Sequence, residues 1–519
     1  MKLRAMTLDF EAGGKSIVFM NREDVQDLGV HSLDRVKLSG KGKELISIID
    51  ITDKLCKKGE IVANSEVANF FKLKLGDSLE VKPTGKPQSV AYIRQKIRNH
   101  ILNKNQMRKI IEDVVCNNLS DIEMSAFVTA LDVNGLSIDE AKHLSEAMIE
   151  TGKRIRISTR KKIVDKHSIG GIPGDKTSMM AVPIIAASGL VIPKTSSRSI
   201  TSPAGTADRM EMLCPVEHSV NEIVKIVKKT NGCLVWGGAL DLAPADDAFI
   251  KVEHPLGIDP LLLPSIMSKK KSVGSRYVVI DIPTGRGAKI KTIGSAHNLA
   301  QNFIELGNRM NMKINCAVTF GEQPLGHSMG PALEAREALQ TIMARGKGPV
   351  DIVEKVTHVA GVLFELTGMK NGKEKAFQIL KSGKAERKMR QIISEQGGNP
   401  KIKPDDIPLG KYKIDVKPKY EVGRVLWIRN AEIAAIAKTA GAPKDHGAGI
   451  YLHKKVGDKV KKTDTIYTIY SNSKHKLKEA EELAEDYKPI FIGKRLSDKM
   501  LLDRIPSNGE HRRIFMLER

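Results

Sequence analysis

Two runs of glycine and hydroxyl-bearing residues, joined by one apolar segment, most strongly constrain how this chain can fold. The first run, DKHSIGGIPGDKTS, covers residues 165–178, and the second, KTSSRSITSPAGT, covers residues 194–206. Glycine allows a backbone N–H to approach a ligand closely, and serine and threonine add short hydrogen-bond donors. The apolar segment at 179–192 has the length of a buried helix, whose N-terminus would present unpaired N–H groups to an anion. Two donor-rich loops around an apolar crossover are typical of a site for a phosphorylated ligand.

The charges and the residue spacing within these runs bear on whether they form a phosphate site, a known nucleotide- or nucleic-acid-binding loop, or polar turns. Five basic side chains lie within them: Lys166, His167, Lys176, Lys194 and Arg198. A Walker A loop is excluded, because residues 174–177 read Gly-Asp-Lys-Thr and place an acid where that loop has glycine. GIPG at 171–174 fits the GXXG of KH domains, which bind nucleic acid, but four residues carry little information. A structural alternative also stays open, in which both runs are polar turns that cap a core helix.

The order of apolar and amphipathic segments predicts the fold class. Beyond the two runs, strands are expected at 233–236, 278–282 and 315–319, and helices at 220–227, 296–310, 334–347 and 378–396. Strands that alternate with helices predict an α/β fold with a mostly parallel sheet. Ligands in such sheets bind at the carboxyl ends of the strands, where residues 237–238 and 283–289 fall.

The remaining segments differ in pattern and predict further domains in this chain of 519 residues. Two capping boxes, Ser120 with Glu123 and Ser137 with Glu140, begin consecutive helices. Period-two alternation on both sides of the Gly-Asp pair at 457–458 predicts a β-hairpin. The predicted domains are a β-rich barrel at 1–84, a helical domain at 88–160 with a later contribution near 330–350, an α/β domain at 161–415, and an α+β domain at 416–519.

The composition bears on compartment and partners. With 41% apolar and 28% charged residues, and no apolar run near the roughly 20 residues of a membrane helix, the chain is expected to be soluble. The start of the chain shows no signal-peptide pattern. Five scattered cysteines without a CxxC pair indicate a cytoplasmic protein with neither disulfides nor a zinc site. A formal net charge of +23 fits either a nucleic-acid binder or an enzyme that attracts anionic substrates.

Several longer segments carry a resemblance to a known family. They are VDKHSIGG, KTSSRSITSPAGTADRME, NGCLVWGGALDLAPADD, SIMSKKKSVGS, GPALEAREAL and AGAPKDHGAGIYLHKKVGDKV, spread over residues 164–460. On these segments the chain resembles the thymidine/pyrimidine-nucleoside phosphorylase family, and most closely its archaeal AMP phosphorylase branch. The resemblance implies a small helical domain that faces the α/β domain across a cleft, and a lipoyl-like hairpin near the C-terminus. It also implies a homodimer formed by helices around residues 110–144. The strand edges of residues 1–84 need covering, which predicts that this dimer can grow into a larger homo-oligomer.

The resemblance assigns the site residue by residue. Inorganic phosphate is expected at Lys166, Ser168, Ser178 (or Thr177, because this loop has one extra residue), Ser196 and Thr206. AMP is expected at Gly171, Ser197, Arg198, Ser199, Ile200, Thr201, Ser202, Thr206, Ser265 and Lys289. Asp259 occupies the position of the proton donor that assists departure of the base. Neither a metal nor another cofactor is implied, and neither nucleic acid nor a membrane is expected as a partner.

The expected reaction is phosphorolysis of AMP, with CMP and UMP as further substrates, to the free base and ribose 1,5-bisphosphate. An enzyme for thymidine or other pyrimidine nucleosides is the first alternative, disfavoured because the arginine expected near Glu253 is absent. A phosphoribosyltransferase would instead bind magnesium through Asp246 and Asp247. An RNA-binding protein would use the GXXG and the basic surface, but only 4% of the residues are aromatic and able to stack on bases.

Overall fold

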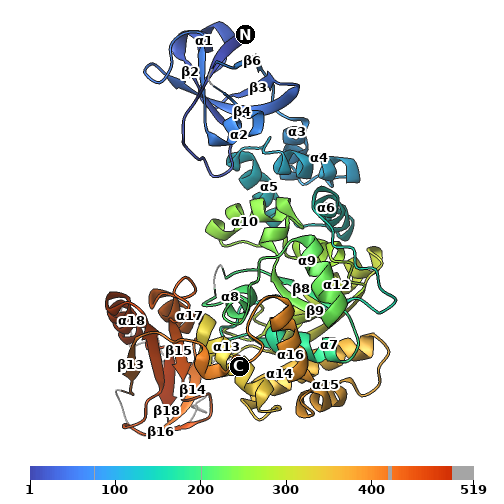
Figure 1. Cartoon of the computed structure of the whole chain (residues 1–519), viewed down its shortest axis with the longest axis vertical. Coiled ribbons are helices and arrows are strands. Elements are labelled where there is room, and N and C mark those ends of the chain that lie inside the picture. The colour runs from blue at the N-terminus through green and yellow to red at the C-terminus, as the bar shows by residue number, and fades with distance from the viewer. Residues whose placement is uncertain (75, 200–201, 419–422, 494–519) are drawn as a thin grey trace, which may run out of the picture. The chain divides into compact units, whose positions relative to one another are not determined.

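The computed structural model describes residues 1–74, 76–199, 202–418 and 423–493 (Figure 1). The chain forms two compact units, Met1–Gly152 with Ala243–Ser268, and Lys153–Leu242 with Lys269–Arg519. Two residues predicted to contact AMP, Ile200 and Thr201, lie outside the described residues. Within the described part, no helix is both long enough and apolar enough to cross a membrane.

The first unit begins with a closed barrel of strands in the order β1-β5-β2-β4-β3-β6. Its elements are β1 (Lys2–Thr7), β2 (Ile17–Asn21), α1 (Arg22–Leu28), β3 (Arg35–Gly40), β4 (Lys43–Thr52), β5 (Glu60–Ala63), α2 (Ser65–Phe71) and β6 (Ser78–Pro83). Buried residues alternate with less buried ones along the strands, so that Val18 and Met20 of β2 point into the core. The predicted β-rich barrel is confirmed. Because the barrel is closed, its strands cover their own edges, and the expected need for a partner at this domain does not arise.

The helical part of the first unit contains α3 (Gln88–Ile97), α4 (Lys104–Val115), α5 (Asp121–Asn134), α6 (Ile138–Thr151), α10 (Pro244–Leu256) and the start of α11 (Leu262–Ser272). Both predicted capping boxes begin helices, at Ser120 for α5 and Ser137 for α6. The helix that joins this part from later in the chain is α10. Its Phe249 lies against Phe127 of α5, with ring centroids 5.9 Å apart. α10 thus takes the place of the helix that was predicted, near residues 330–350, to join the helical domain. The helix found there buries its alanine and leucine side chains in the core of the other unit.

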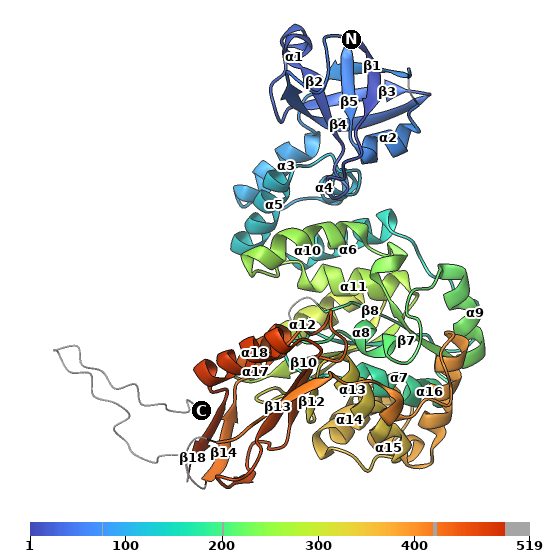
Figure 2. The same ribbon diagram turned by 60° about the vertical axis from the view of Figure 1, so that its left-hand side comes forward.

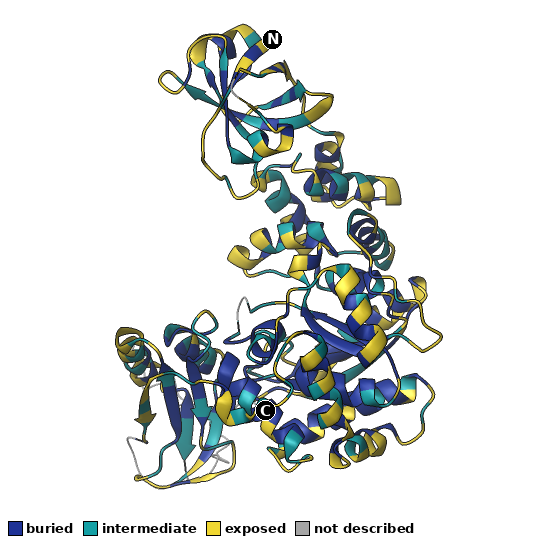
Figure 3. Cartoon of the chain, in the orientation of Figure 1, coloured by how far each residue is buried: buried dark blue, intermediate teal, exposed yellow. Residues whose placement is uncertain are grey.

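The second unit contains the predicted parallel strands. β10 (Tyr277–Thr284) pairs in parallel with β7 (Val164–Ser168) on one side and with β11 (Lys313–Phe320) on the other. β8 (Ile192–Ser196) pairs in parallel with β9 (Gly232–Trp236). β7, β8, β9 and β10 are largely buried, whereas β11 is partly exposed (Figure 3). The helices around them are α7 (Thr177–Ala187), α8 (Thr206–Glu211), α9 (Val220–Thr230), α12 (Ile293–Arg309), α13 (Pro331–Met343), α14 (Val350–Leu366), α15 (Gly372–Lys381) and α16 (Lys384–Glu395).

The C-terminal part of the second unit is the predicted α+β domain. It comprises β12 (Ser328–Met329), β13 (Tyr412–Val416), β14 (Gly423–Ile428), α17 (Asn430–Thr439), β15 (Gly449–Leu452), β16 (Lys459–Val460), β17 (Tyr467–Ser471), α18 (Lys474–Tyr487) and β18 (Ile490–Gly493). The hairpin predicted at residues 457–458 is wrong, because the strands on its two sides do not pair with each other. β15 pairs with β17, whereas β16 pairs with β14, so long-range pairing overrides the local turn signal.

Candidate active site

The two glycine- and hydroxyl-rich runs come together because β7 and β8 begin side by side. Val164 donates its backbone N–H to the carbonyl oxygen of Val191 over 2.8 Å. Beyond this point the strands separate, since β7 joins the sheet of β10 and β11 while β8 pairs with β9. Ligands of α/β proteins bind outside the carboxyl ends of strands where neighbouring strands diverge. Ser168 and Ser196 are the last residues of β7 and β8, so both runs reach this place.

A cluster of buried charges lies under these loops. Its members are the ammonium groups of Lys166, Lys194, Lys270 and Lys355 and the carboxylates of Asp165, Asp175 and Asp281, and their ion pairs of 2.8–3.8 Å fall into two neighbouring groups. Asp165 pairs with Lys194 and Lys270, whereas Lys166 and Lys355 pair with Asp281, and Lys355 also pairs with Asp175. Four ammonium groups against three carboxylates leave one surplus positive charge when all are ionised. Burial, and then the neighbouring ammonium of Lys270, lower the pKa of Lys194 well below its ordinary value. A buried surplus cation is costly, which is why the pKa of Lys194 falls, and a bound anion would compensate the charge and favour the protonated form of Lys194.

Lys166, Ser168 and Ser178 meet at one end of this cluster. The Nζ atom of Lys166 lies 3.5 Å from the Oγ of Ser178 and 3.7 Å from a carboxylate oxygen of Asp281. Ser168 donates its hydroxyl to Asp175 over 3.1 Å. Burial alone would raise the pKa of Asp175, but Lys355 and Lys166 hold it well below its ordinary range. The structure thus brings together three of the five predicted phosphate-binding residues, with an ionised Asp175 orienting one of the hydroxyls.

Lys355, which lies on α14, is not among the site residues predicted from the sequence. Its ammonium group lies 3.1 Å from Asp281 and 3.4 Å from Asp175, and therefore links the two carboxylates that contact Lys166 and Ser168. A signal was present in the sequence. Lys355 falls in the helical register of the buried residues Ile352 and Val359, and a charge within an apolar stripe requires a buried partner.

The second run is shaped by Asp208 at the start of α8. Its carboxylate accepts backbone N–H bonds from Ser199 and Gly205, each 2.8 Å long. A Cβ atom at Gly205 would lie 2.6 Å from the backbone nitrogen of Ser199, so only glycine fits this close approach. Thr206 follows as the first residue of α8, and its hydroxyl accepts from Arg209 over 3.5 Å. The carboxylate of Asp208 therefore holds the backbone of Ser199 against that of Gly205.

Two of the basic residues in these runs serve the fold. Arg198, predicted to contact AMP, donates both Nη atoms to Glu211, over 2.5 and 2.8 Å, and lies above the Trp236 ring. Lys176 is fully buried and donates to Glu337 over 2.5 Å and to the carbonyl oxygen of Leu325 over 3.0 Å. The side chains of these two cations therefore hold the loops against α8 and α13.

A third loop, residues 285–289 after β10, meets the first run. A Cβ atom at Gly171 would lie 2.7 Å from the backbone nitrogen of Lys289. Gly171 also has a φ of +93°, a conformation that side chains rarely adopt. Gly171 and Lys289 were both assigned to AMP, although they are 118 positions apart in the chain (289 minus 171). Their backbones lie against each other in the structure.

The other predicted residues lie as follows. Ser196 donates its hydroxyl to the carbonyl oxygen of Val235 over 3.3 Å. The carbonyl oxygen of Ser197 accepts from the backbone N–H of Ala207 over 3.4 Å, and that of Ser202 accepts from the hydroxyl of Ser199. Thr177, the alternative to Ser178, is fully buried as the first residue of α7. Asp259 and Ser265 belong to the first unit, where Asp259 is half-buried between α10 and α11 and Ser265 lies within α11.

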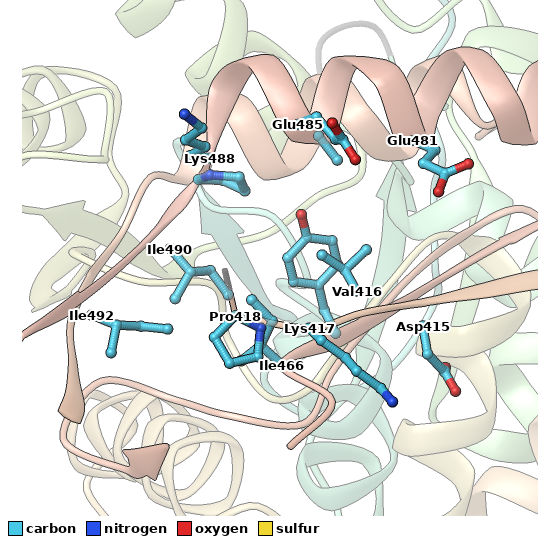
Figure 4. Close-up of a pocket in the computed structure, with 13 residues that line it drawn as sticks. Asp415, Val416, Lys417, Pro418, Ile466, Glu481, Glu485, Lys488, Ile490 and Ile492 are labelled. Atoms are coloured by element: carbon cyan, nitrogen blue, oxygen red, sulfur yellow. The ribbon is translucent and has the colours of Figure 1, made fainter. Parts of the chain in front are cut away.

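A cavity of about 300 Å³ lies elsewhere, in the C-terminal domain. Its walls are the end of β13, the start of β18 and the face of α18 that carries Glu481 and Glu485 (Figure 4). Apolar side chains such as Val416 and Ile490 line much of it, and Asp415, at its margin, accepts a hydrogen bond from Thr468. The described residues that line the cavity include none of those assigned to phosphate or AMP.

Three parts of the chain match models of known protein families. Residues 160–386 match the glycosyl transferase family a/b domain, residues 90–152 match the helical bundle domain of that family, and residues 425–490 match the pyrimidine nucleoside phosphorylase C-terminal domain. Anthranilate phosphoribosyltransferase from Thermus thermophilus is similar in structure, with a TM-score of 0.50 and 17% identity over 59% of this chain and 98% of that one. At this identity the similarity shows a shared fold alone.

Relatives over the whole chain are more informative. The AMP phosphorylase of Thermofilum pendens is 46% identical over 505 residues, which cover 97% of this chain and 98% of that protein. The AMP phosphorylase of Thermococcus sibiricus is 48% identical over 510 residues, with coverages of 97% and 99%. The AMP phosphorylase of Methanocaldococcus jannaschii is 46% identical over 510 residues, again with 97% and 99%.

Proposed function

The chain belongs to the family of AMP phosphorylases, and from this premise we propose that it cleaves AMP with inorganic phosphate to adenine and ribose 1,5-bisphosphate. The observation that carries the proposal is the buried charge cluster with its surplus ammonium group, because Lys166, Ser168 and Ser178 supply a cation and two hydroxyls there. A phosphate dianion requires a cation together with several donors directed at its oxygens. CMP and UMP are proposed as further substrates, since the chemistry at the ribose is the same.

The proposed mechanism follows from the chemistry of the N-glycosidic bond. Phosphate attacks C1′ of the ribose while the bond to the base breaks, through a state with oxocarbenium character like that of glycosidases. Lys166 and the two hydroxyls hold the nucleophile, and Lys355 supports them through Asp175 and Asp281. Asp259 donates a proton to the departing adenine, which would otherwise leave as an anion. The proton thus moves from a carboxyl group to a ring nitrogen as the new C–O bond forms.

An assay of free base release tests the proposal directly. We expect adenine to be released from AMP only when phosphate is present, and the rate to persist with EDTA in the buffer. CMP and UMP are tested in parallel, with thymidine and uridine as nucleoside controls. Efficient cleavage of the nucleosides without any cleavage of AMP would contradict the nucleotide assignment. A requirement for Mg²⁺ would instead favour the phosphoribosyltransferase alternative.

We also propose that the enzyme is cytoplasmic and acts as a homodimer. The five cysteines are unpaired, as in a reducing compartment. Ile110 and Leu144, at the limits of the predicted dimer contact, are buried in the helical core. Within α3 to α6 and the turns between them, the exposed large apolar side chains belong to Ile97, Ile101, Ile122 and Val133. Exposed apolar side chains of this size are what an interface between subunits would cover.

Light scattering tests the assembly. The full chain is expected to have twice the mass of one subunit. A chain that begins at Gln88 should remain dimeric, because the closed barrel leaves no strand edges that require a partner. Replacing Ile122 and Val133 by aspartate should shift the equilibrium toward monomer, because charges would then have to be desolvated at the contact. A monomeric full chain would contradict the proposal. Loss of the dimer on removal of residues 1–87 would place the contact in the barrel.

A further inference from the structure

Asn430, the first residue of α17 in the C-terminal domain, joins two loops of the α/β domain. Its side-chain Nδ2 atom donates to the carbonyl oxygen of Gly287 over 3.1 Å and to that of Gly321 over 2.9 Å. Gly287 lies in the loop after β10, and Gly321 follows the last residue of β11. Asn430 itself is only 2% exposed. One buried amide group therefore uses both of its N–H donors on loops at the carboxyl ends of adjacent parallel strands.

The fit between Asn430 and these loops is close. A Cβ atom at Gly287 would lie 2.6 Å from Nδ2 of Asn430, and a Cβ atom at Gly321 would lie 2.8 Å from the Cβ of Ala288. The two loops also bond to each other, since Gly321 donates its N–H to the carbonyl oxygen of Thr284 over 2.8 Å. Glycine at both positions allows this approach, so Asn430 and the two loops form one packed unit.

A second contact from the same domain reaches the same loop. The guanidinium carbon of Arg286, the neighbour of Gly287, lies 5.2 Å from the ring centroid of Trp427 on β14. Such a geometry is attractive because the ring face carries negative charge density. In Figure 2, α17 lies near β10, which is followed by the loop that carries Gly287. Trp427 and Asn430 of the C-terminal domain thus contact two adjacent residues of the loop at 285–289, Arg286 and Gly287.

This loop leads directly to the nucleotide residues. Lys289 is two positions beyond Gly287, and its backbone lies against Gly171 of the first run. We propose that Asn430 is a positioning residue for AMP, which fixes the 285–289 loop so that Lys289 and Gly171 keep their mutual geometry. The inference rests on the proposed function of these two residues. It gives the C-terminal domain a role in nucleotide binding that acts through the loop at 285–289.

Kinetics of Asn430→Ala give the first test. We expect KM for AMP to rise about tenfold, the effect of losing hydrogen bonds that order a binding loop, while KM for phosphate changes less than about twofold. Asn430→Ser keeps one donor and should fall between the alanine variant and the wild type. The matched control is Asn472→Ala in the same domain, whose side chain bonds Asp445 and Lys411 away from the loop. An unchanged KM for AMP, or equal rises in both KM values with a lower Tm, would overturn the proposal.

Hydrogen exchange without nucleotide gives a test that does not depend on activity. The N–H groups of Gly285 and Ala288 are bonded within the loop, to Ile290 and Gly285. They should exchange faster in Asn430→Ala and Asn430→Ser, whereas peptides of β7 and α7 should be unaffected. If the wild type fails to cleave AMP, the proposed function is wrong but this measurement still tests the positioning. Exchange at 285–290 equal to that of the wild type would overturn the positioning role even in an active enzyme.

Discussion

Replacing Lys166 by methionine is expected to lower kcat/KM for phosphate by about 10²–10³-fold, the range seen when one preorganised electrostatic contact is removed. Methionine keeps most of the apolar stem but removes the ammonium group that lies 3.5 Å from Ser178. The charge cluster would then hold equal numbers of cations and carboxylates, and its attraction for an anion would fall. KM for AMP should change little, because the loops around Asp208 and Gly171 are intact. Initial rates with phosphate varied at saturating AMP measure the effect.

Lys96→Met is the matched control for that substitution. Lys96 is as buried as Lys166 and donates to Glu140 over 2.9 Å, but it belongs to the helical part of the first unit. Its loss should lower Tm and leave kcat/KM for phosphate near the wild-type value. Lys166→Arg restores a cation with a different shape and should recover part of the activity. If Lys166→Met retained half of the wild-type value, phosphate would have to bind elsewhere.

Local signals in the sequence predicted the features that depend on local chemistry. The capping boxes at Ser120 and Ser137 begin helices, and the alternation of strands and helices gives the parallel pairing of β7, β10 and β11. The helix predicted at 378–396 is found as two, α15 and α16, because Gly383 has a φ of +75° and separates them. Such elements follow from spacing and turn residues alone.

Long-range pairing explains what the sequence could not predict. Lys355 links Asp175 to Asp281 through contacts between residues that are far apart in the chain and carry no common motif. The segment of α10 joins the helical core although it follows β9 in the chain. β16 pairs with β14 across 35 positions (459 minus 424), despite a turn signal beside it. In each case a distant partner, absent from the local pattern, determines the outcome.

Asp259→Asn is expected to lower kcat for AMP by about 10²-fold or more, within the range that general acid help contributes. Asparagine preserves the shape of the side chain but cannot supply the proton. KM for AMP should stay near the wild-type value, because the proton transfer stabilises the transition state and not the bound substrate. Steady-state rates of adenine release with saturating phosphate measure the loss. Asp132→Asn, an exposed residue of the same unit, is the matched control and should leave kcat unchanged.

A nucleotide whose base needs no proton distinguishes general acid catalysis by Asp259 from a role in folding or binding. AMP methylated at N7 of adenine releases a neutral base when the glycosidic bond breaks, so the acid is not needed. The defect of Asp259→Asn should therefore shrink from about 10²-fold with AMP to less than about tenfold with the methylated nucleotide. An equal loss with both substrates would show that Asp259 acts in another way. Near wild-type turnover of AMP by the variant would exclude it as the proton donor, and the acid would then have to be sought among the other polar groups that contact the base.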